Sequence, residues 1–362
     1  MTTGRRWMIL SLSAVVLGFL AGAVIITLTG RSPGLMFAAM VKAFSGLDIL
    51  RGSFNARYIG EFLIQMIPIT LTGLSVGFAF RAGLFNIGAE GQLMMGALGG
   101  TMVALLVPAP PWLHLPLCLL GAMVGGGLWG LIPGWLKAWY NLHEVVVTIM
   151  LNYTALHLSN WALLHVVGTV DRVKTSPFPA SALLKSEFLS SITRGSRLHW
   201  GLLIMVVCIL VYWVVIEKTT LGFGLRATGH NKDAARFAGF PIAGYTMLTM
   251  AMSGAFAGLA GGAMALGTFG FGRVLPAFEG YGMDGIAVAL VGGNTAWGIA
   301  ASGALFGMLK AAQPLMQSQG VPREIAGIIQ ASIVLFVAMR YGIQLVIDRV
   351  SRIRQGGRNE GV

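Results

Sequence analysis

Charged residues are scarce in this sequence. Its 362 residues include 25 lysines and arginines and 13 aspartates and glutamates, which is 10% charged against 56% hydrophobic. A soluble domain carries roughly a quarter charged residues, so this composition excludes a water-soluble fold. Glycine is abundant, at 51 residues. Since small residues let helices approach each other closely in a bilayer, we expect an all-α membrane protein, a polytopic bundle of helices.

Residues and motifs typical of catalysis are also few. The two cysteines, Cys118 and Cys208, lie in apolar runs without CxxC spacing, so the sequence indicates neither a disulfide framework nor a zinc site. It has no GxxxxGK[ST] phosphate loop, no HExxH and no GxSxG. We therefore expect no catalytic residue, no metal and no cofactor on this chain.

The net charge of +12 could suggest nucleic acid, but the basic residues are scattered and form no basic helix interleaved with aromatic residues. The nearest run lies at the C-terminus, with Arg349, Arg352, Arg354 and Arg358. Such residues next to a membrane usually face anionic lipid on the cytoplasmic side. We expect a lipid bilayer as the partner of this surface, and no nucleic acid.

Ten apolar stretches are candidate membrane spans. The first is long enough to cross the hydrocarbon core of about 30 Å, and too long for the apolar part of a signal peptide, although Ala21–Ala23 resembles a cleavage site. The eighth is too short to cross alone, so it should borrow residues from the preceding Gly/Phe-rich loop or form a broken helix. A count of eight or nine spans is the alternative. The candidates are Met8–Thr29, Ile59–Phe80, Gly91–Val107, Leu113–Leu136, Val145–Val167, Trp200–Ile216, Ala243–Thr268, Met283–Gly293, Trp297–Met316 and Ile325–Tyr341.

The distribution of lysine and arginine predicts the orientation. With the N-terminus inside, ten spans place the C-terminus inside too, and basic residues then concentrate in the short inner loops. We expect a multi-pass protein of the bacterial cytoplasmic (inner) membrane with both termini cytoplasmic. The whole chain, 1–362, is predicted to be one domain, with a membrane core over 8–348, a cytoplasmic loop at 217–242 and an extracytoplasmic loop at 168–199.

Glycines at GxxxG spacing predict close helix contacts within this bundle. Several spans carry the pattern, which favours a compact arrangement over helices that face lipid singly. The pairs are Gly18/Gly22, Gly73/Gly77, Gly121/Gly125, Gly126/Gly130, Gly254/Gly258, Gly258/Gly262 and Gly303/Gly307.

Polar residues within the spans are modest in number: Gln65, Asn152, His157 and Lys310. Each must find a partner or face a cavity, so helix-to-helix hydrogen bonds and a polar translocation path are both open. The acidic residues lie at span edges or in loops, and Glu279 and Asp284 flank the short eighth span. No carboxylate cluster lies in mid-span, which disfavours proton or ion coupling.

The most informative polar segment is the inner loop Leu221–Pro241, LGFGLRATGHNKDAARFAGFP. Asn231 is a good N-cap for a short helix, and Asp233 in the first turn favours the positive end of the helix dipole. Gly239 and Pro241 should end this helix. A simple connection needs only a few residues, so we expect either an interfacial helix on the lipid or a docking surface for a cytoplasmic partner.

Three blocks resemble the permease subunits of bacterial ABC importers for simple sugars and nucleosides. The first is GLSVGFAFRAGLFNIGAEGQLMMG at Gly73–Gly96, and the third is GMDGIAVALVGGNTAWGIAASGALFG at Gly282–Gly307. Between them, Asp233-Ala234-Ala235 followed by Gly239 is similar to the EAAxxxG coupling signature, with Asp in place of Glu. Together the blocks extend from the second span to the ninth.

This resemblance implies a division of labour between chains. Such permeases work in pairs, with cytoplasmic ABC ATPase subunits that bind ATP and Mg, and with an extracytoplasmic substrate-binding protein. The version with FRAGLFNIGAEGQ is similar to nucleoside-type permeases, whose second permease subunit is a different chain. It implies a coupling helix seated on the ATPase, formed by Asn231, Asp233, Ala234, Ala235, Arg236 and Gly239. It also places the segment Phe85–Gln92 near the translocation pathway, with the candidates Phe85, Asn86, Glu90 and Gln92, and the mid-span Asn152 is a further candidate. A purely structural turn at a helix start is the alternative explanation of this segment.

Several functional alternatives remain at this stage. A nucleoside is the first choice of substrate, a simple sugar (pentose or hexose) the second and a branched-chain amino acid a more distant third. An ion-coupled secondary transporter belongs to another energetic class, and an intramembrane enzyme or scaffold to a third. A substrate-binding protein and an ATPase encoded next to this gene would exclude the last of these.

Overall fold

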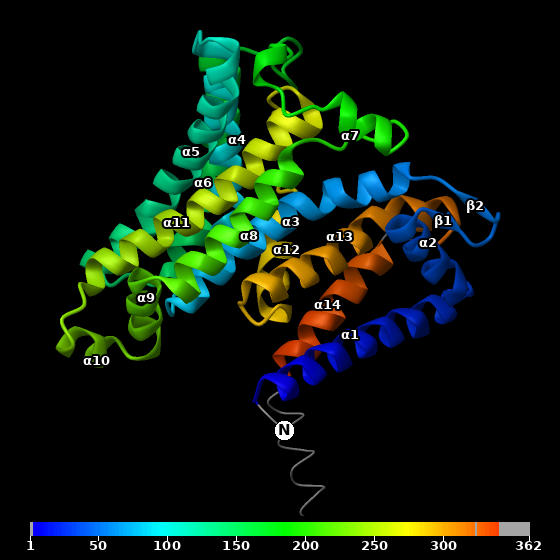
Figure 1. Ribbon diagram of the computed structural model, residues 1–362, viewed down its shortest axis with the longest axis horizontal. Helices are drawn as coiled ribbons and strands as arrows, with labels where there is room; N and C mark the ends of the chain where they lie inside the picture. Colours follow the sequence, from blue (N-terminus) through cyan, green and yellow to red (C-terminus); the bar gives the residue numbers. More distant parts are fainter. Residues whose placement is uncertain (1–2, 323, 340–362) are drawn as a thin grey trace, which may run out of the picture. The chain divides into compact units, whose positions relative to one another are not determined.

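The computed structural model describes residues 3–322 and 324–339. The described chain is predominantly helical, as the composition predicts (Figure 1). Its elements are α1 (Thr3–Leu28), α2 (Pro33–Ser45), β1 (Leu47–Asp48), β2 (Ser53–Phe54), α3 (Arg57–Arg81), α4 (Ala89–Leu106), α5 (Pro111–Tyr140), α6 (Glu144–Ala162), the π-helical turn η1 (Leu163–Val167), the 3-10 turn η2 (Ala180–Ala182), α7 (Glu187–Ile192), α8 (Gly201–Lys218), α9 (Thr220–His230), α10 (Lys232–Phe237), α11 (Ile242–Ala263), the π-helical turn η3 (Met264–Phe269), α12 (Tyr281–Val291), α13 (Ala296–Ser318) and α14 (Glu324–Ala338).

The ten predicted spans all correspond to observed helices. Their limits agree within a few residues, and the sixth predicted span, for example, is α8. The last residues of the tenth span, the C-terminal arginines and the end of the predicted membrane core lie outside the described residues. By length and composition, four described helices are each able to cross a membrane, namely α3, α5, α8 and α11 with η3.

The chain divides into two compact units, Met1–Phe37 with Met316–Val362, and Ala38–Leu315. In the described part of the first unit, α1 packs on α14, and Gly18 and Gly22 lie against Ile333 and Ile329. The second unit contains α3 to α12 and most of α13. The prediction of one domain over 1–362 stays a prediction.

Helices α4, α5 and α11 of the second unit pack closely against one another (Figure 1). Their glycines face each other with backbone against backbone. A Cβ added to Gly126 on α5 would collide with the carbonyl of Gly254 on α11, and one added to Gly258 would collide with that of Ala122. Every predicted GxxxG pair lies against a neighbouring helix, through backbone atoms at some glycines and side-chain atoms at others, so the predicted close contacts are confirmed.

Two connections between helices are unwound rather than helical. Residues 82–88 separate α3 from α4, and residues 270–280 separate η3 from α12. The helix α12 has 11 residues and reaches about 16 Å, so it cannot cross a bilayer alone. The eighth predicted span is thus a short helix that follows an unwound segment, and whether it borrows residues from that segment or forms a broken helix across the membrane stays a prediction.

The second unit has two distinct ends. At one end, here called the α10 end, α9 contacts the turn after α3, where Gly229 approaches Gly83. At the other, here called the loop end, the segment 168–199 is hydrogen-bonded to residues that follow α11. Thr175 N donates to Gly272 O at 2.9 Å, and Leu184 N to Leu266 O at 3.0 Å. The short helix α7 lies at the loop end (Figure 1).

Candidate functional sites

The predicted coupling helix is present as α10, Lys232–Phe237. The side chain of Asn231 caps it by accepting hydrogen bonds from the amides of Asp233 and Ala234, both at 3.0 Å. Asp233 lies in the first turn, and Gly239 ends the helix with a φ of 85°. This left-handed conformation favours glycine, which is why the chain turns there. The capped helix is confirmed, and its docking on an ATPase stays a prediction.

One face of α10 is exposed to solvent. Ala235 is buried against the rest of the chain, whereas the Phe237 side chain is 94% exposed. Lys232 and Arg236 belong to the same helix, so the exposed phenylalanine has positive neighbours. An aromatic ring presented to solvent on a rigid, capped helix is typical of an interface anchor. The sequence motif did not single out Phe237, because the coupling signature leaves its position open.

Helix α9, which the sequence analysis did not predict, connects α10 to the membrane helices. Gly222 packs on the carbonyls of Val215 and Ile216 at the end of α8. At its other end, a Cβ on Gly229 would lie 2.7 Å from the backbone of Ala82 and Gly83. Only glycine fits at both contacts. Helix α9 is therefore held between α8 and the unwound turn after α3.

An ion-pair cluster reinforces this corner. The two oxygens of Glu217 on α8 bind Arg81 of α3 at 2.5 Å and Arg226 of α9 at 2.7 Å. One carboxylate thus joins three helices at the α10 end. A movement of α9 is expected to reach α3 through this carboxylate and through the contact between Gly229 and Gly83.

The unwound turn 82–88 is stabilised by buried amide side chains. Asn86 donates to Ser253 Oγ on α11 at 2.7 Å and to Gln92 Oε1 at 2.8 Å. Its own carbonyl accepts from Gly88 N at 2.9 Å, and Ser253 Oγ donates to Ser75 O on α3. An unwound backbone has unpaired amides, and each must be satisfied within the chain in an apolar interior. These residues tie α3, α4 and α11 together.

Glu90 joins the first unwound turn to the second. It lies in the first turn of α4 with only 2% of its surface exposed. Its carboxylate accepts from the amides of Glu279 and Gly280, both at 2.9 Å, and of Gly282 at 2.5 Å. The Glu90 carboxyl group therefore faces the N-termini of both α4 and α12, where the helix dipoles favour a carboxylate.

Asn152 on α6 completes this cluster. It donates to Ile87 O at 3.0 Å and accepts from Gly91 N at 2.8 Å. The structure brings four predicted pathway residues together, Asn86, Glu90, Gln92 and Asn152, all buried and bonded within the chain. The fifth, Phe85, is half-buried and packs on Phe80. Their role in lining a pathway stays a prediction, and in this conformation they hold the two breaks in position.

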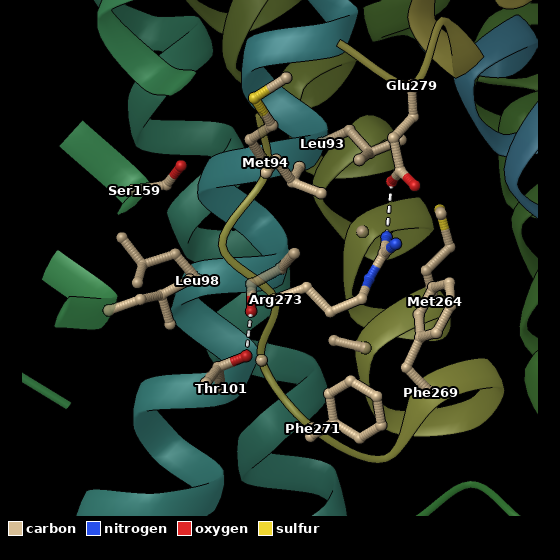
Figure 2. A pocket seen from close by; sticks show the side chains of 16 residues that line it. Leu93, Met94, Leu98, Thr101, Ser159, Met264, Phe269, Phe271, Arg273 and Glu279 are labelled. Carbon is tan, nitrogen blue, oxygen red and sulfur yellow. Dashed lines mark hydrogen bonds and ion pairs between the residues drawn. The ribbon is translucent and has the colours of Figure 1, made fainter. Parts of the chain in front are cut away.

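A pocket that the sequence analysis missed lies beside the second unwound segment (Figure 2). Its internal volume is about 40 Å³, which has room for a few water molecules. The side chain of Arg273 extends through it, with its guanidinium 3.5 Å from the centroid of the Phe269 ring and 2.6 Å from a Glu279 oxygen. We call this the Arg273 pocket. Its other lining residues include Leu93, Thr101, Ser159 and Phe271.

The backbone at this pocket is fixed in extended form by two polar side chains. Asn160 on α6 donates to Leu275 O at 2.7 Å and accepts from Leu275 N at 2.9 Å, replacing a β-strand partner. At the loop end, Thr175 donates through its backbone amide to Gly272 O and accepts from Gly272 N through Oγ1, each at 2.9 Å. The unwound segment thus keeps its shape without a helix.

Both π-helical turns reach the Arg273 pocket. Leu163 of η1 and Met264 and Phe269 of η3 are among its lining residues. Single π-helical turns inside α-helices occur frequently at functional sites. The sequence held a partial signal, since Gly270, Gly272 and Gly280 interrupt the span and Glu279 was noted beside it. Asp284, noted with Glu279, pairs instead with Lys310 at 2.8 Å.

Comparison with known proteins assigns the family. Residues 58–338 match the family described as branched-chain amino acid transport system / permease component. The chain is 44% identical over 346 residues to the guanosine ABC transporter permease protein NupP of Bacillus subtilis (strain 168), covering 95% of this chain and 97% of that protein. The nucleoside ABC transporter permease protein NupB of Lactococcus lactis subsp. cremoris is 34% identical, covering 98% and 97%. The glucose ABC transporter permease protein TsgB13 of Haloferax volcanii is 36% identical, covering 80% and 79%.

The chain therefore belongs to this family of transport permeases, and it is a membrane-spanning permease subunit of an ABC transporter. The resemblance carried by the three sequence blocks is confirmed.

Proposed function

We propose that this chain forms part of the translocation pathway of an ATP-driven importer for nucleosides. The observation that carries the proposal is the 44% identity, over nearly the full length of both chains, to a permease named for guanosine. The capped helix α10 supports transport driven by ATP, because a rigid helix outside the membrane spans offers a docking surface for an ATPase subunit.

The proposal includes partners and an orientation. The α10 end faces the cytoplasm, where an ABC ATPase binds ATP and Mg and contacts α10. Both termini are cytoplasmic, in the inner membrane. A second permease chain completes the pathway, and an extracytoplasmic substrate-binding protein delivers the solute at the loop end. The basic residues of the short loops support this orientation.

Transport in proteoliposomes tests the proposal. The chain is reconstituted with its ATPase, second permease and binding protein, and uptake of radiolabelled guanosine is followed with ATP inside the vesicles. We expect uptake that requires hydrolysable ATP and persists when ionophores dissipate ion gradients. Uptake that disappears with the gradients while ATP is preserved would identify a secondary transporter instead.

A simple sugar is the second candidate, because a permease named for glucose is 36% identical over 80% of this chain. The same vesicles decide between the two solutes. Binding of guanosine and of D-glucose to the isolated binding protein is measured in parallel. Binding and uptake of glucose without guanosine would establish the sugar and exclude the nucleoside.

A further inference from the structure

We infer that the Arg273 pocket is a solute-contact site of the permease, in which Phe269 stacks on the base of a nucleoside and Glu279 accepts hydrogen bonds from its hydroxyls. This inference rests on the proposed nucleoside function and adds to it a place in the chain. It concerns residues outside the predicted pathway set around Asn86 and Glu90.

The location of the pocket suits a passage from the loop end inward. A second, larger and more open pocket of about 660 Å³ lies at the loop end, with Lys185, Ser190 and Arg197 among its lining residues. Phe269 lines both pockets. The Phe269 ring is therefore shared by an open polar space and the narrow Arg273 pocket. On the far side, Glu279 lies next to Glu90, whose carboxylate binds its amide.

Arg273 occupies the place that a solute would take. Its guanidinium is a flat, polar group stacked on one face of Phe269, and it donates to the carboxylate of Glu279. A nucleoside offers the same combination, since its base is a flat ring and its ribose donates hydrogen bonds. An aromatic ring can stack on any base, whatever the pattern of hydrogen-bond donors and acceptors on that base. Phe269 and Glu279, which now bind Arg273, are thus chemically suited to bind a nucleoside in its place.

The surroundings allow a side chain to move while the backbone stays. Asn160 and Thr175 hold the extended segment on both sides of Arg273. Arg273 and Glu279 are both partly exposed, at 26% and 23% of their side-chain surface, so solvent reaches the pair. Displacing Arg273 from Phe269 would widen the pocket without refolding the unwound segment.

A purely structural role is the competing explanation, and the chain provides a matched comparison. Lys42 on α2 also combines an ion pair, to Asp48 at 2.8 Å, with a cation–π contact, 4.8 Å from the centroid of Tyr58. It lines none of the pockets described above. If Arg273 only braces the fold, then Arg273→Gln and Lys42→Gln should have similar effects on transport.

The test uses the complete reconstituted transporter, with a cysteine at Ser159 as a reporter. Ser159 lines the Arg273 pocket and is itself only 5% exposed, so its labelling reports opening of the pocket during turnover. The unsubstituted chain, whose Cys118 and Cys208 are also buried, gives the background. Labelling of Ser159→Cys by a small water-soluble thiol reagent is followed during turnover, with and without guanosine. We expect guanosine to slow labelling several-fold. Ser45→Cys, half-buried on α2 and outside both pockets, should label at the same rate in both conditions.

Transport variants give a second measurement that does not depend on the reporter. Guanosine uptake per complex should fall about tenfold in Phe269→Leu, because one base–aromatic stacking contact is lost. Arg273→Gln should also lower uptake, and Lys42→Gln should leave it near the unsubstituted level at equal amounts of assembled complex.

The outcomes separate this inference from the function on which it rests. Guanosine uptake with no protection of Ser159→Cys and with normal turnover of Phe269→Leu would overturn the solute-contact site and leave the nucleoside function standing. If the unsubstituted complex fails to transport guanosine, the nucleoside function and the ligand assigned to this pocket are both wrong.

Discussion

Glu90 shows how much one side chain can decide in an apolar interior. Its carboxylate satisfies three backbone amides of the segment that leads into α12, and it has almost no contact with solvent. Removing an acceptor from buried donors costs about 1–3 kcal/mol for each group left unpaired. The residue therefore links the two broken helices energetically as well as geometrically.

Replacement of Glu90 by glutamine should destabilise the protein by about 2 kcal/mol, since the amide keeps one acceptor and loses the charge. Thermal unfolding of the purified complex in detergent measures the change. The matched control is Glu187→Gln, because Glu187 also lies in the first turn of a helix but is exposed on α7. Equal unfolding midpoints for the two variants would contradict this role of Glu90.

His199 supplies a pH dependence at the loop end. Burial, with a smaller contribution from the charge of Arg197, lowers the pKa of His199 from 6.5 to about 4. Its ring contacts Thr268 Oγ1 through Nε2 at 3.1 Å and accepts from Gly201 N at 3.1 Å. Because the folded pKa is depressed, the unfolded chain binds the proton more readily between these two values. The contribution of neutral His199 to the stability is fully present above pH 6.5 and is lost as the pH falls towards 4.

We expect His199→Gln to remove this component of acid sensitivity. Between neutral pH and about pH 5, the free energy of unfolding should fall by roughly 2 kcal/mol more in the native protein than in the variant. Unfolding midpoints of both proteins across this pH range provide the comparison, in which acidic groups common to both cancel. Parallel pH profiles would show that His199 does not titrate as its burial implies.

Among the elements, α10 is distinguished by the exposed ring of Phe237. If α10 is the seat of the ATPase, Phe237→Ala should weaken ATPase binding at least about tenfold, as for a central aromatic anchor. Affinity of the purified ATPase for the permease pair in detergent is the measurement. The control is Phe188→Ala, since Phe188 is 65% exposed on α7, a helix of equal length at the loop end.

The same experiment distinguishes a protein partner from a lipid surface. A helix that only lies on lipid would bind the ATPase equally well with and without the Phe237 ring in detergent. Unchanged affinity of Phe237→Ala would therefore contradict the docking role and favour the interfacial helix.

Helix packing in the second unit depends on glycine rather than on large apolar residues. Gly258→Ala on α11 should destabilise the bundle by about 1–3 kcal/mol or more, because its new methyl group would meet the carbonyl of Ala122. Gly244→Ala lies on the same helix, where the nearest side-chain atom is 4.0 Å away, and it should be tolerated. The fraction of each variant that elutes as folded monodisperse complex, together with its unfolding midpoint, tests the difference. Equal behaviour of the two alanines would mean that the backbones separate at low cost.

At the scale of the whole molecule, the sequence pattern was enough to locate the spans, the break before α12 and the capped helix α10. Each of these depends on local properties such as run length, glycine spacing and a capping residue. The pocket around Arg273 could not be predicted in this way. Its parts come from α4, α6, η3 and the unwound segment, and only the tertiary fold brings Ser159 and Phe269 to one cavity. The sequence did not indicate helix α9, because a segment with this many glycines is typical of a loop. In the structure the same glycines permit its close packing.

Coupling between the two ends depends on connections that no single helix provides. Helix α10 continues from α9, and α9 is joined to α3 by Glu217 and by the contact of Gly229 with Gly83. From there, the Asn86 cluster and Glu90 lead to the N-terminus of α12. An ion pair that is partly exposed adds little static stability. Its loss should therefore appear in the coupling of movements rather than in the unfolding midpoint.

Glu217→Gln should leave ATP hydrolysis by the reconstituted transporter near normal and lower the guanosine taken up per ATP hydrolysed. The matched control is Glu144→Gln, which breaks the pair between Glu144 and Lys137 at 2.9 Å, at the α10 end but away from α9. Combining Glu217→Gln with Arg226→Gln should add little further loss, because both variants remove the same connection. Additive losses, or an unchanged ratio of uptake to hydrolysis in Glu217→Gln, would show that α9 transmits its movement by another route.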